Sequence, residues 1–75
     1  MAEIRARSGY MMKDSTIKKI REKYRIEYIA NQVGISFTYL SLIINKRKHC
    51  SKMVAYAITK TIDSEAEIDE LFERI

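Results

Sequence analysis

The stretch GISFTYLSLIINKR, residues 34–47, carries the strongest structural pattern in the sequence. Gly34 precedes an apolar run, and glycine accepts the left-handed conformation in which helices often end. Ser36 is a residue type that caps helix N-termini. The apolar residues beyond it fall on one helical face: Leu40, Ile43 and Ile44. The stretch therefore predicts a turn and a short amphipathic helix, which Asn45 ends because asparagine tolerates a left-handed exit.

Helical patterns also precede this turn. The segment IEYIANQV, residues 26–33, predicts one short helix, and STIKKIREKY, residues 15–24, predicts another with Asp14 or Ser15 as its cap. Two helices meet near a right angle only where no bulky side chain separates their backbones. Ala30 and Gly34 meet this requirement, so the helices over residues 26–33 and 37–44 are expected to cross closely.

Two further helices are predicted after residue 50. Ser51 can cap a helix with the apolar stripe Val54, Ala57, Ile58, Thr61 and Ile62. Ser64 and Glu67 stand three residues apart, as in a capping box, and open a fifth helix. Its apolar face consists of Ile68, Leu71, Phe72 and Ile75. Since there are only two glycines and no proline, the sequence predicts an all-α fold, a compact bundle of about five short helices.

The length of 75 residues is enough for one hydrophobic core and therefore for one domain. We assign residues 14–75 to this domain. Residues 1–13 show no sustained period and are interpreted as a flexible basic arm. Met11 or Met12 could equally begin the chain, in which case the arm would be dispensable.

Several classes of protein are excluded by composition. The single cysteine cannot form an internal disulfide, which favours a reducing compartment. No apolar run reaches the roughly 20 residues of a membrane span, so a cytoplasmic protein without a membrane partner is expected. His49 and Cys50 are adjacent but lack the further ligands of a zinc site, and no base is visible to activate Cys50. We therefore expect no metal, no cofactor, no small-molecule ligand and no enzymatic activity.

Charge is distributed unevenly along the chain. Residues 1–52 hold twelve Lys or Arg and four Asp or Glu, whereas residues 53–75 hold two and six. A basic segment followed by an acidic one indicates a molecule with one face for a polyanion, although an unevenly charged solvated surface would give the same pattern.

The segment IANQVGISFTYLSLIINKRKHCS, residues 29–51, resembles the small phage-repressor and Cro-like helix-turn-helix family, also called the XRE family. The shared features are Ala30 four residues before Gly34, Ile35-Ser36, Tyr39-Leu40-Ser41, the basic stretch after Asn45, and Ser51. The resemblance covers about residues 15–72. It implies a lambda-repressor-like bundle with residues 27–45 as the helix-turn-helix, whose second helix enters the DNA major groove.

Three positions depart from that family. Ile26 replaces a glutamine that often steadies a phosphate, Lys46 replaces the glycine common after the asparagine, and Ile44 replaces a frequent glutamate. The first departure removes one expected phosphate contact. Lys46 adds charge at a cost in backbone strain, and Ile44 is expected to pack inward.

The resemblance implies a sequence-specific regulator of transcription that binds double-stranded DNA, a small phage or mobile-element repressor that occludes a promoter at the nucleoid. The residues assigned to the bases are Phe37, Thr38, Ser41 and Leu42. Those assigned to phosphates are Tyr39, Asn45, Lys46, Arg47 and Lys48. Phe37, Thr38 and Leu42 can all touch the thymine methyl group, which predicts a reader of A·T-containing steps.

A surplus of apolar residues in the fifth predicted helix suggests a partner. We assign Leu71, Phe72 and Ile75 to a homodimer contact, which would set two reading helices one DNA turn apart. The alternative is a protein-interaction module, like an antitoxin or an adaptor, that docks a protein through Leu42, Phe72 and Ile75.

Overall fold

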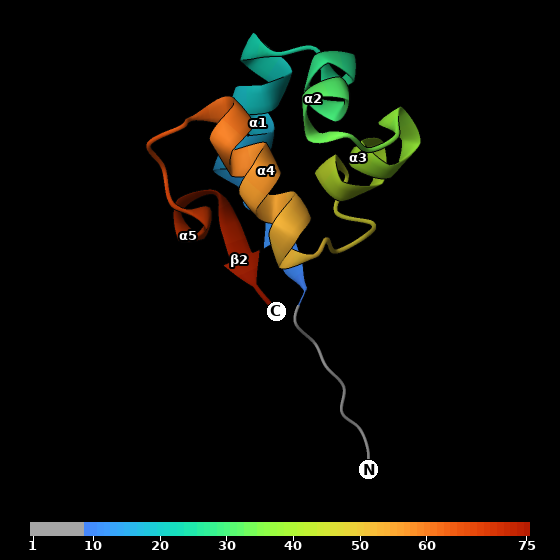
Figure 1. Ribbon diagram of the computed structural model, residues 1–75. Helices are drawn as coiled ribbons and strands as arrows, with labels where there is room; N and C mark the ends of the chain where they lie inside the picture. The colour runs from blue at the N-terminus through green and yellow to red at the C-terminus, as the bar shows by residue number, and fades with distance from the viewer. Residues whose placement is uncertain (1–8) are drawn as a thin grey trace.

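The computed structural model describes residues 9–75, so the basic residues Arg5 and Arg7 of the predicted arm lie outside the described residues. The described chain is small and mostly helical (Figure 1). Its elements are β1 (Tyr10–Met12), α1 (Asp14–Lys23), α2 (Ile26–Val33), α3 (Phe37–Ile44), α4 (Lys52–Ile62), α5 (Ile68–Leu71) and β2 (Phe72–Arg74). Helix α4 crosses the middle of the molecule, with α2 and α3 on one side and α5 and β2 on the other.

The prediction of an all-α fold is wrong at both ends of the described chain, which pair as a two-stranded antiparallel sheet. Tyr10 lies opposite Arg74, and Met12 opposite Phe72. The other edge of β1 bonds to the loop before α4, where Tyr10 and Cys50 exchange backbone hydrogen bonds of 2.8 and 3.0 Å. Residues 10–12 therefore belong to the fold and not to a flexible arm.

The predicted fifth helix is shorter than its apolar spacing suggested. Helix α5 ends at Leu71, and its capping box is formed by Glu67 and Glu70, not by Ser64 and Glu67. The chain then extends as β2, because pairing with β1 buries Phe72 almost completely beside the equally buried Met12. A continued helix would forgo the hydrogen bonds with β1.

Helix α1 begins without the predicted side-chain cap from Asp14 or Ser15, since its N-cap residue is Lys13. Its first turn is held instead by α5. The Leu71 carbonyl accepts hydrogen bonds from the Lys13 backbone N–H at 3.0 Å and from the Thr16 hydroxyl at 2.7 Å. Ser51 caps α4 as predicted, by accepting from the Val54 N–H at 3.2 Å.

The core combines side chains from both strands and from helices α1–α5. The largest fully buried side chains are Met12, Ile20, Ile29, Leu40, Ile43, Ile44, Ile58, Thr59 and Phe72. In α4 the buried face is Ala55, Ile58, Thr59 and Ile62, whereas Val54, Ala57 and Thr61 of the predicted stripe are only half-buried. Contact with both α2 and α5 rotates this helix relative to the predicted stripe. Within residues 9–75, every helix is too short or too polar to cross a lipid bilayer.

Candidate functional site

The turn between α2 and α3 has the local geometry that its sequence predicts. Gly34 ends α2 in the left-handed conformation with φ of 87°, and its N–H donates to the Ala30 carbonyl at 2.8 Å. The Ser36 hydroxyl caps α3 by accepting from the Tyr39 N–H at 3.0 Å. A Cβ at position 34 would meet no atom within 4 Å, so glycine is required here for its φ and not for a close approach of backbones.

Helix α3 divides its side chains between the core and the surface. Leu40, Ile43 and Ile44 are buried, which confirms the inward packing expected of Ile44. Of the four residues assigned to bases, Thr38 is exposed, Phe37 is 49% exposed, and Ser41 and Leu42 are half-buried. Among the residues assigned to bases, those in the first turn of α3 are therefore the most accessible.

Tyr39 lies at the edge of this surface and is half-buried. Burial raises the pKa of its hydroxyl, and a smaller electrostatic effect of Cys50 acts in the same direction. The phenol therefore stays protonated at neutral pH, so it can donate a hydrogen bond to an anionic oxygen.

The end of α3 departs from the prediction for Asn45. Asn45 has φ of −86°, and the left-handed residue is Lys46 with φ of 61°. The Lys46 N–H bonds to the Ile43 carbonyl at 3.1 Å and the Arg47 N–H to the Leu42 carbonyl at 2.9 Å. This pair of bonds is a Schellman motif, in which the residue after the C-cap must be left-handed and is usually glycine.

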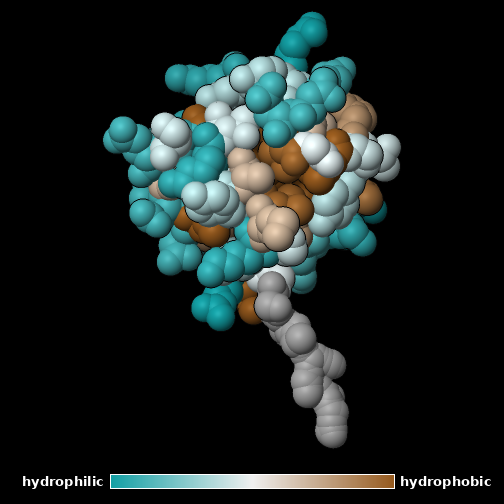
Figure 2. All heavy atoms as spheres, in the orientation of Figure 1, coloured by the Kyte–Doolittle hydropathy of each residue, from teal (hydrophilic) through white to brown (hydrophobic). Residues whose placement is uncertain are grey.

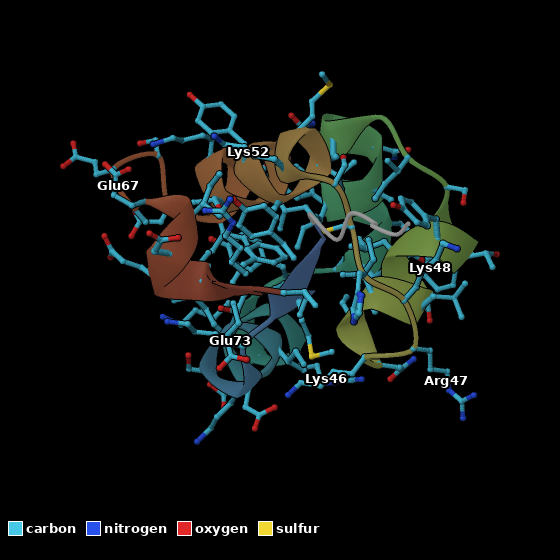
Figure 3. The ribbon with its side chains drawn as sticks, turned by 90° about the horizontal axis from the view of Figure 1, so that it is seen from below. Lys46, Arg47, Lys48, Lys52, Glu67 and Glu73 are labelled. Atoms are coloured by element: carbon cyan, nitrogen blue, oxygen red, sulfur yellow. The ribbon has the colours of Figure 1, made fainter. Side chains whose placement is uncertain are left out.

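Lys46, Arg47 and Lys48 follow the helix as a basic segment, but their charges are not equally free. The Lys46 ammonium lies 2.6 Å from the Asp14 carboxylate of α1, and its side chain is 38% exposed. Arg47 and Lys48 are exposed and form no ion pair within residues 9–75. Figure 3 shows Arg47 reaching away from the ribbon. Arg47 and Lys48 are therefore better placed than Lys46 to hold phosphates.

Asn45 is already engaged by α1. The Arg21 guanidinium donates to its carboxamide oxygen at 2.9 Å. Neither Arg21 nor Asp14 was assigned to the site from sequence, because helical periodicity does not indicate that α1 lies beside the end of α3. The only sequence feature that pointed to α1 is its basic composition, with Lys18, Lys19, Arg21 and Lys23.

Cys50 and His49 do not form a reactive pair. The Cys50 thiol is buried and donates weakly to the Tyr10 carbonyl at 3.7 Å, and burial raises its pKa to about 11. It is therefore protonated at neutral pH and a poor nucleophile. Residues 9–75 contain no cluster of three or more side chains able to hold a metal ion.

Two of the three residues assigned to a dimer contact lie inside the chain's own core. Leu71 and Phe72 are buried against the rest of the domain, so neither can cover a partner. This correction follows from the strand β2, which turns the Phe72 ring inward. Ile75 remains at the surface.

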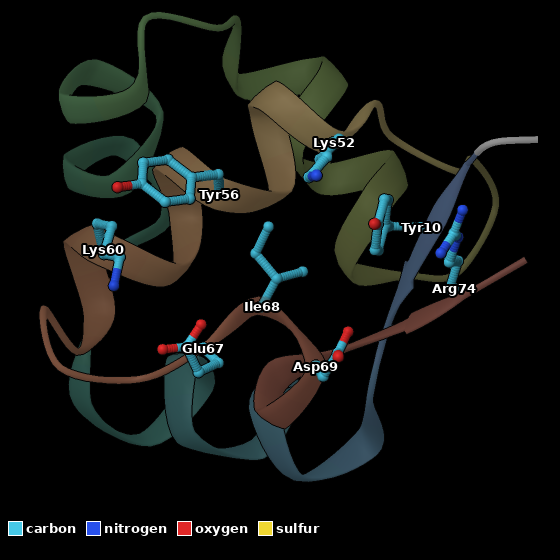
Figure 4. A pocket seen from close by; sticks show the side chains of 8 residues that line it. All are labelled: Tyr10, Lys52, Tyr56, Lys60, Glu67, Ile68, Asp69 and Arg74. Carbon is cyan, nitrogen blue, oxygen red and sulfur yellow. The ribbon is translucent and has the colours of Figure 1, made fainter.

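A hollow of about 370 Å³ lies between α4, α5 and the sheet (Figure 4). It is lined by Tyr10, Lys52, Tyr56, Lys60, Glu67, Ile68, Asp69 and Arg74. The Lys60 ammonium already has partners within the protein, since it donates hydrogen bonds to the Ser64 and Ala66 carbonyls at 3.2 and 2.9 Å. Both signs of charge line the hollow, and no side chain assigned from the sequence to bases or phosphates lies there.

Comparison of the chain with family models, curated proteins and solved structures gives no match. The resemblance to the Cro-like family therefore remains a prediction from the residues in and around the turn.

Proposed function

We propose that the protein is a sequence-specific double-stranded DNA-binding transcription regulator, a small Cro-like repressor that occludes a promoter. The observation that carries the proposal is the juxtaposition of an exposed first turn of α3 with Arg47 and Lys48 just beyond the same helix, two exposed cations that form no ion pair within residues 9–75. In this proposal α2, the turn at Gly34 and α3 form a helix-turn-helix. Helix α3 would lie in the major groove.

The two groups of residues would have different tasks. Phosphate contacts fix the position of a protein on the duplex, whereas contacts with base edges carry sequence information. Arg47 and Lys48, with the protonated Tyr39 hydroxyl, supply the first kind. Phe37 and Thr38 at the exposed start of α3 supply the second, together with the accessible parts of Ser41 and Leu42.

Replacing Arg47 or Lys48 with alanine tests the phosphate contacts. Each substitution should weaken binding to all duplexes alike and reduce the slope of log affinity against log salt by about one, because one fewer counterion is released. The measurement is duplex binding over a salt series, after selection of a preferred site from random duplexes. Arg74→Ala removes the same charge from β2, outside α3 and the basic segment that follows it, and should leave the slope unchanged. Equal slopes for all variants would contradict the assignment.

Replacing thymine with uracil inside the selected site tests the base contacts. Loss of a methyl touched by Phe37, Thr38 or Leu42 should cost on the order of 1 kcal/mol, the low end of the cost of a wrong base pair. Thymine replacement outside the site is the control, and Leu42→Ala should make one step insensitive to the change. Equal affinity for uracil and thymine throughout the site would refute methyl reading.

A protein-docking module is the second candidate, favoured by the apolar residues that reach the surface. The large ones with substantial exposure are Tyr28, Phe37, Met53, Tyr56 and Ile75. Figure 2 shows apolar residues gathered between α4 and the α2–α3 pair. Apolar docking would depend weakly on salt, whereas duplex binding should fall steeply as salt rises, so the salt series separates the two functions.

A further inference from the structure

A chain of two side-chain hydrogen bonds connects α1 to the candidate reading face of α3. The Arg21 guanidinium donates to the Asn45 carboxamide oxygen at 2.9 Å, and the Asn45 carboxamide nitrogen donates to the Ser41 hydroxyl oxygen at 3.4 Å. The ion pair between Lys46 and Asp14 lies beside it. Asp14 and Arg21 are seven residues apart, which sets both on one side of α1 at a spacing of about two turns.

The chemistry of these groups gives the hydrogen bonds one direction. A guanidinium carries only donors, so Asn45 must present its oxygen to Arg21. The nitrogen of the carboxamide is thereby turned toward Ser41, whose hydroxyl oxygen accepts. The hydroxyl hydrogen of Ser41 then remains free to donate elsewhere.

Ser41 does not use that hydrogen within its own helix. Hydroxyl groups in helices often donate to the carbonyl four residues earlier, as Thr61 does to Ala57 at 2.8 Å. Within residues 9–75 the only hydrogen bond of the Ser41 side chain is the one it accepts from Asn45. Ser41 is half-buried, so part of the residue is open to solvent, and it shares a helical face with the exposed Thr38, three residues earlier.

We infer that Arg21 is a positioning residue that fixes Ser41 as a hydrogen-bond donor toward DNA. This inference rests on the proposed function and deepens it. The free hydrogen of Ser41 then favours a base edge that offers an acceptor, such as guanine N7 or O6, adenine N7 or thymine O4. Opposite the donor amino group of cytosine this hydrogen would find no acceptor, so cytosine is disfavoured there. Arg21 sets this preference through Asn45 without touching the base.

The test is a selection from random duplexes with the wild-type chain, Arg21→Ala and Lys23→Ala. Lys23 is the matched control, because it is an exposed cation of the same helix and forms no side-chain hydrogen bond within residues 9–75. Arg21→Ala should reduce discrimination at one base pair by about fivefold, the effect of one ordinary hydrogen bond, and Lys23→Ala should leave it intact. In a Ser41→Ala background, Arg21→Ala should have no further effect on discrimination, since the two residues act through one contact.

Asn45→Asp provides the sharpest variant. A carboxylate still pairs with Arg21 but has no hydrogen to give, so Ser41 must donate to it and faces outward as an acceptor. The preferred base at that step should therefore change from an acceptor edge to a donor edge, such as the cytosine amino group. The added negative charge lowers overall affinity, but the selection compares bases and not absolute affinities.

A second readout does not involve DNA. In the free protein the Asn45 side-chain amide should be rigid by NMR relaxation, and Arg21→Ala should make it mobile while Lys23→Ala does not. A mobile amide in the wild type would overturn the inference, as would identical base preferences for Arg21→Ala and Lys23→Ala. If the wild-type chain has a rigid Asn45 amide but selects no duplex sequence, the proposed function itself fails and the inference fails with it.

Discussion

Met12→Ala is expected to destabilise the domain by about 2–5 kcal/mol, the usual cost of truncating a buried long aliphatic side chain. The Met12 side chain is 1% exposed and lies opposite Phe72 in the sheet. A chain of 75 residues has a free energy of unfolding of about 4–11 kcal/mol, at roughly 0.05–0.15 kcal/mol per residue. The substitution would therefore remove a large part of the total, and urea unfolding followed by circular dichroism measures it.

The matched control is Met53→Ala, since Met53 is 80% exposed and should change the unfolding midpoint very little. A chain that begins at Met12 is a stronger test of the same strand. It lacks Tyr10, whose backbone bonds to Cys50 and whose side chain is buried. We expect this chain to show no cooperative unfolding. A stable truncated chain would restore the interpretation of residues 1–13 as a dispensable arm.

Phe72→Ala is expected to cost about 3–5 kcal/mol, because the ring is 1% exposed and its removal leaves a cavity in the core. Ile75→Ala, three residues later at a position 49% exposed, should cost far less. Urea unfolding at two protein concentrations tests whether the ring serves the core or a dimer. A core residue gives a loss independent of concentration, whereas a residue that stabilises a dimer gives a concentration-dependent one. The second outcome would contradict the structure.

Local signals account for the parts of the fold that could be predicted from sequence. Gly34 and Ser36 are adjacent to the helix ends they form, and the spacing of Leu40, Ile43 and Ile44 is a property of a single helix. The sheet has no such signal, because each strand has three residues and Met12 pairs with Phe72, 60 positions away. The apolar spacing after residue 67 fits a helix as well as a short helix followed by a strand.

The candidate site likewise has a part that local sequence signals predict and a part that depends on packing between helices. The exposed positions Phe37 and Thr38 follow from helical periodicity once the buried residues of α3 are known. The contacts of Arg21 with Asn45 and of Asp14 with Lys46 join α1 to the end of α3. They depend on how the helices pack, which periodicity does not specify. The left-handed conformation of Lys46 could not be predicted either. Glycine is the usual residue at this position of a Schellman motif and would have indicated the conformation, whereas lysine does not.

The pairing of β1 with β2 also determines how the domain responds to mechanical force. Gly9 and Ile75 lie at the same end of the antiparallel sheet and are joined by a hydrogen bond of 2.9 Å from the Ile75 N–H to the Gly9 carbonyl. Tension applied outward from these two residues loads one pair of the ladder at a time, from that end toward Lys13 and Leu71, so the strands unzip instead of shearing. A motor-driven protease that pulls on the chain at either of these residues would thus meet the sheet in its weakest direction. A domain that withstands urea could still be unfolded quickly by such an enzyme, because forced unfolding is governed by a rate and not by the equilibrium free energy.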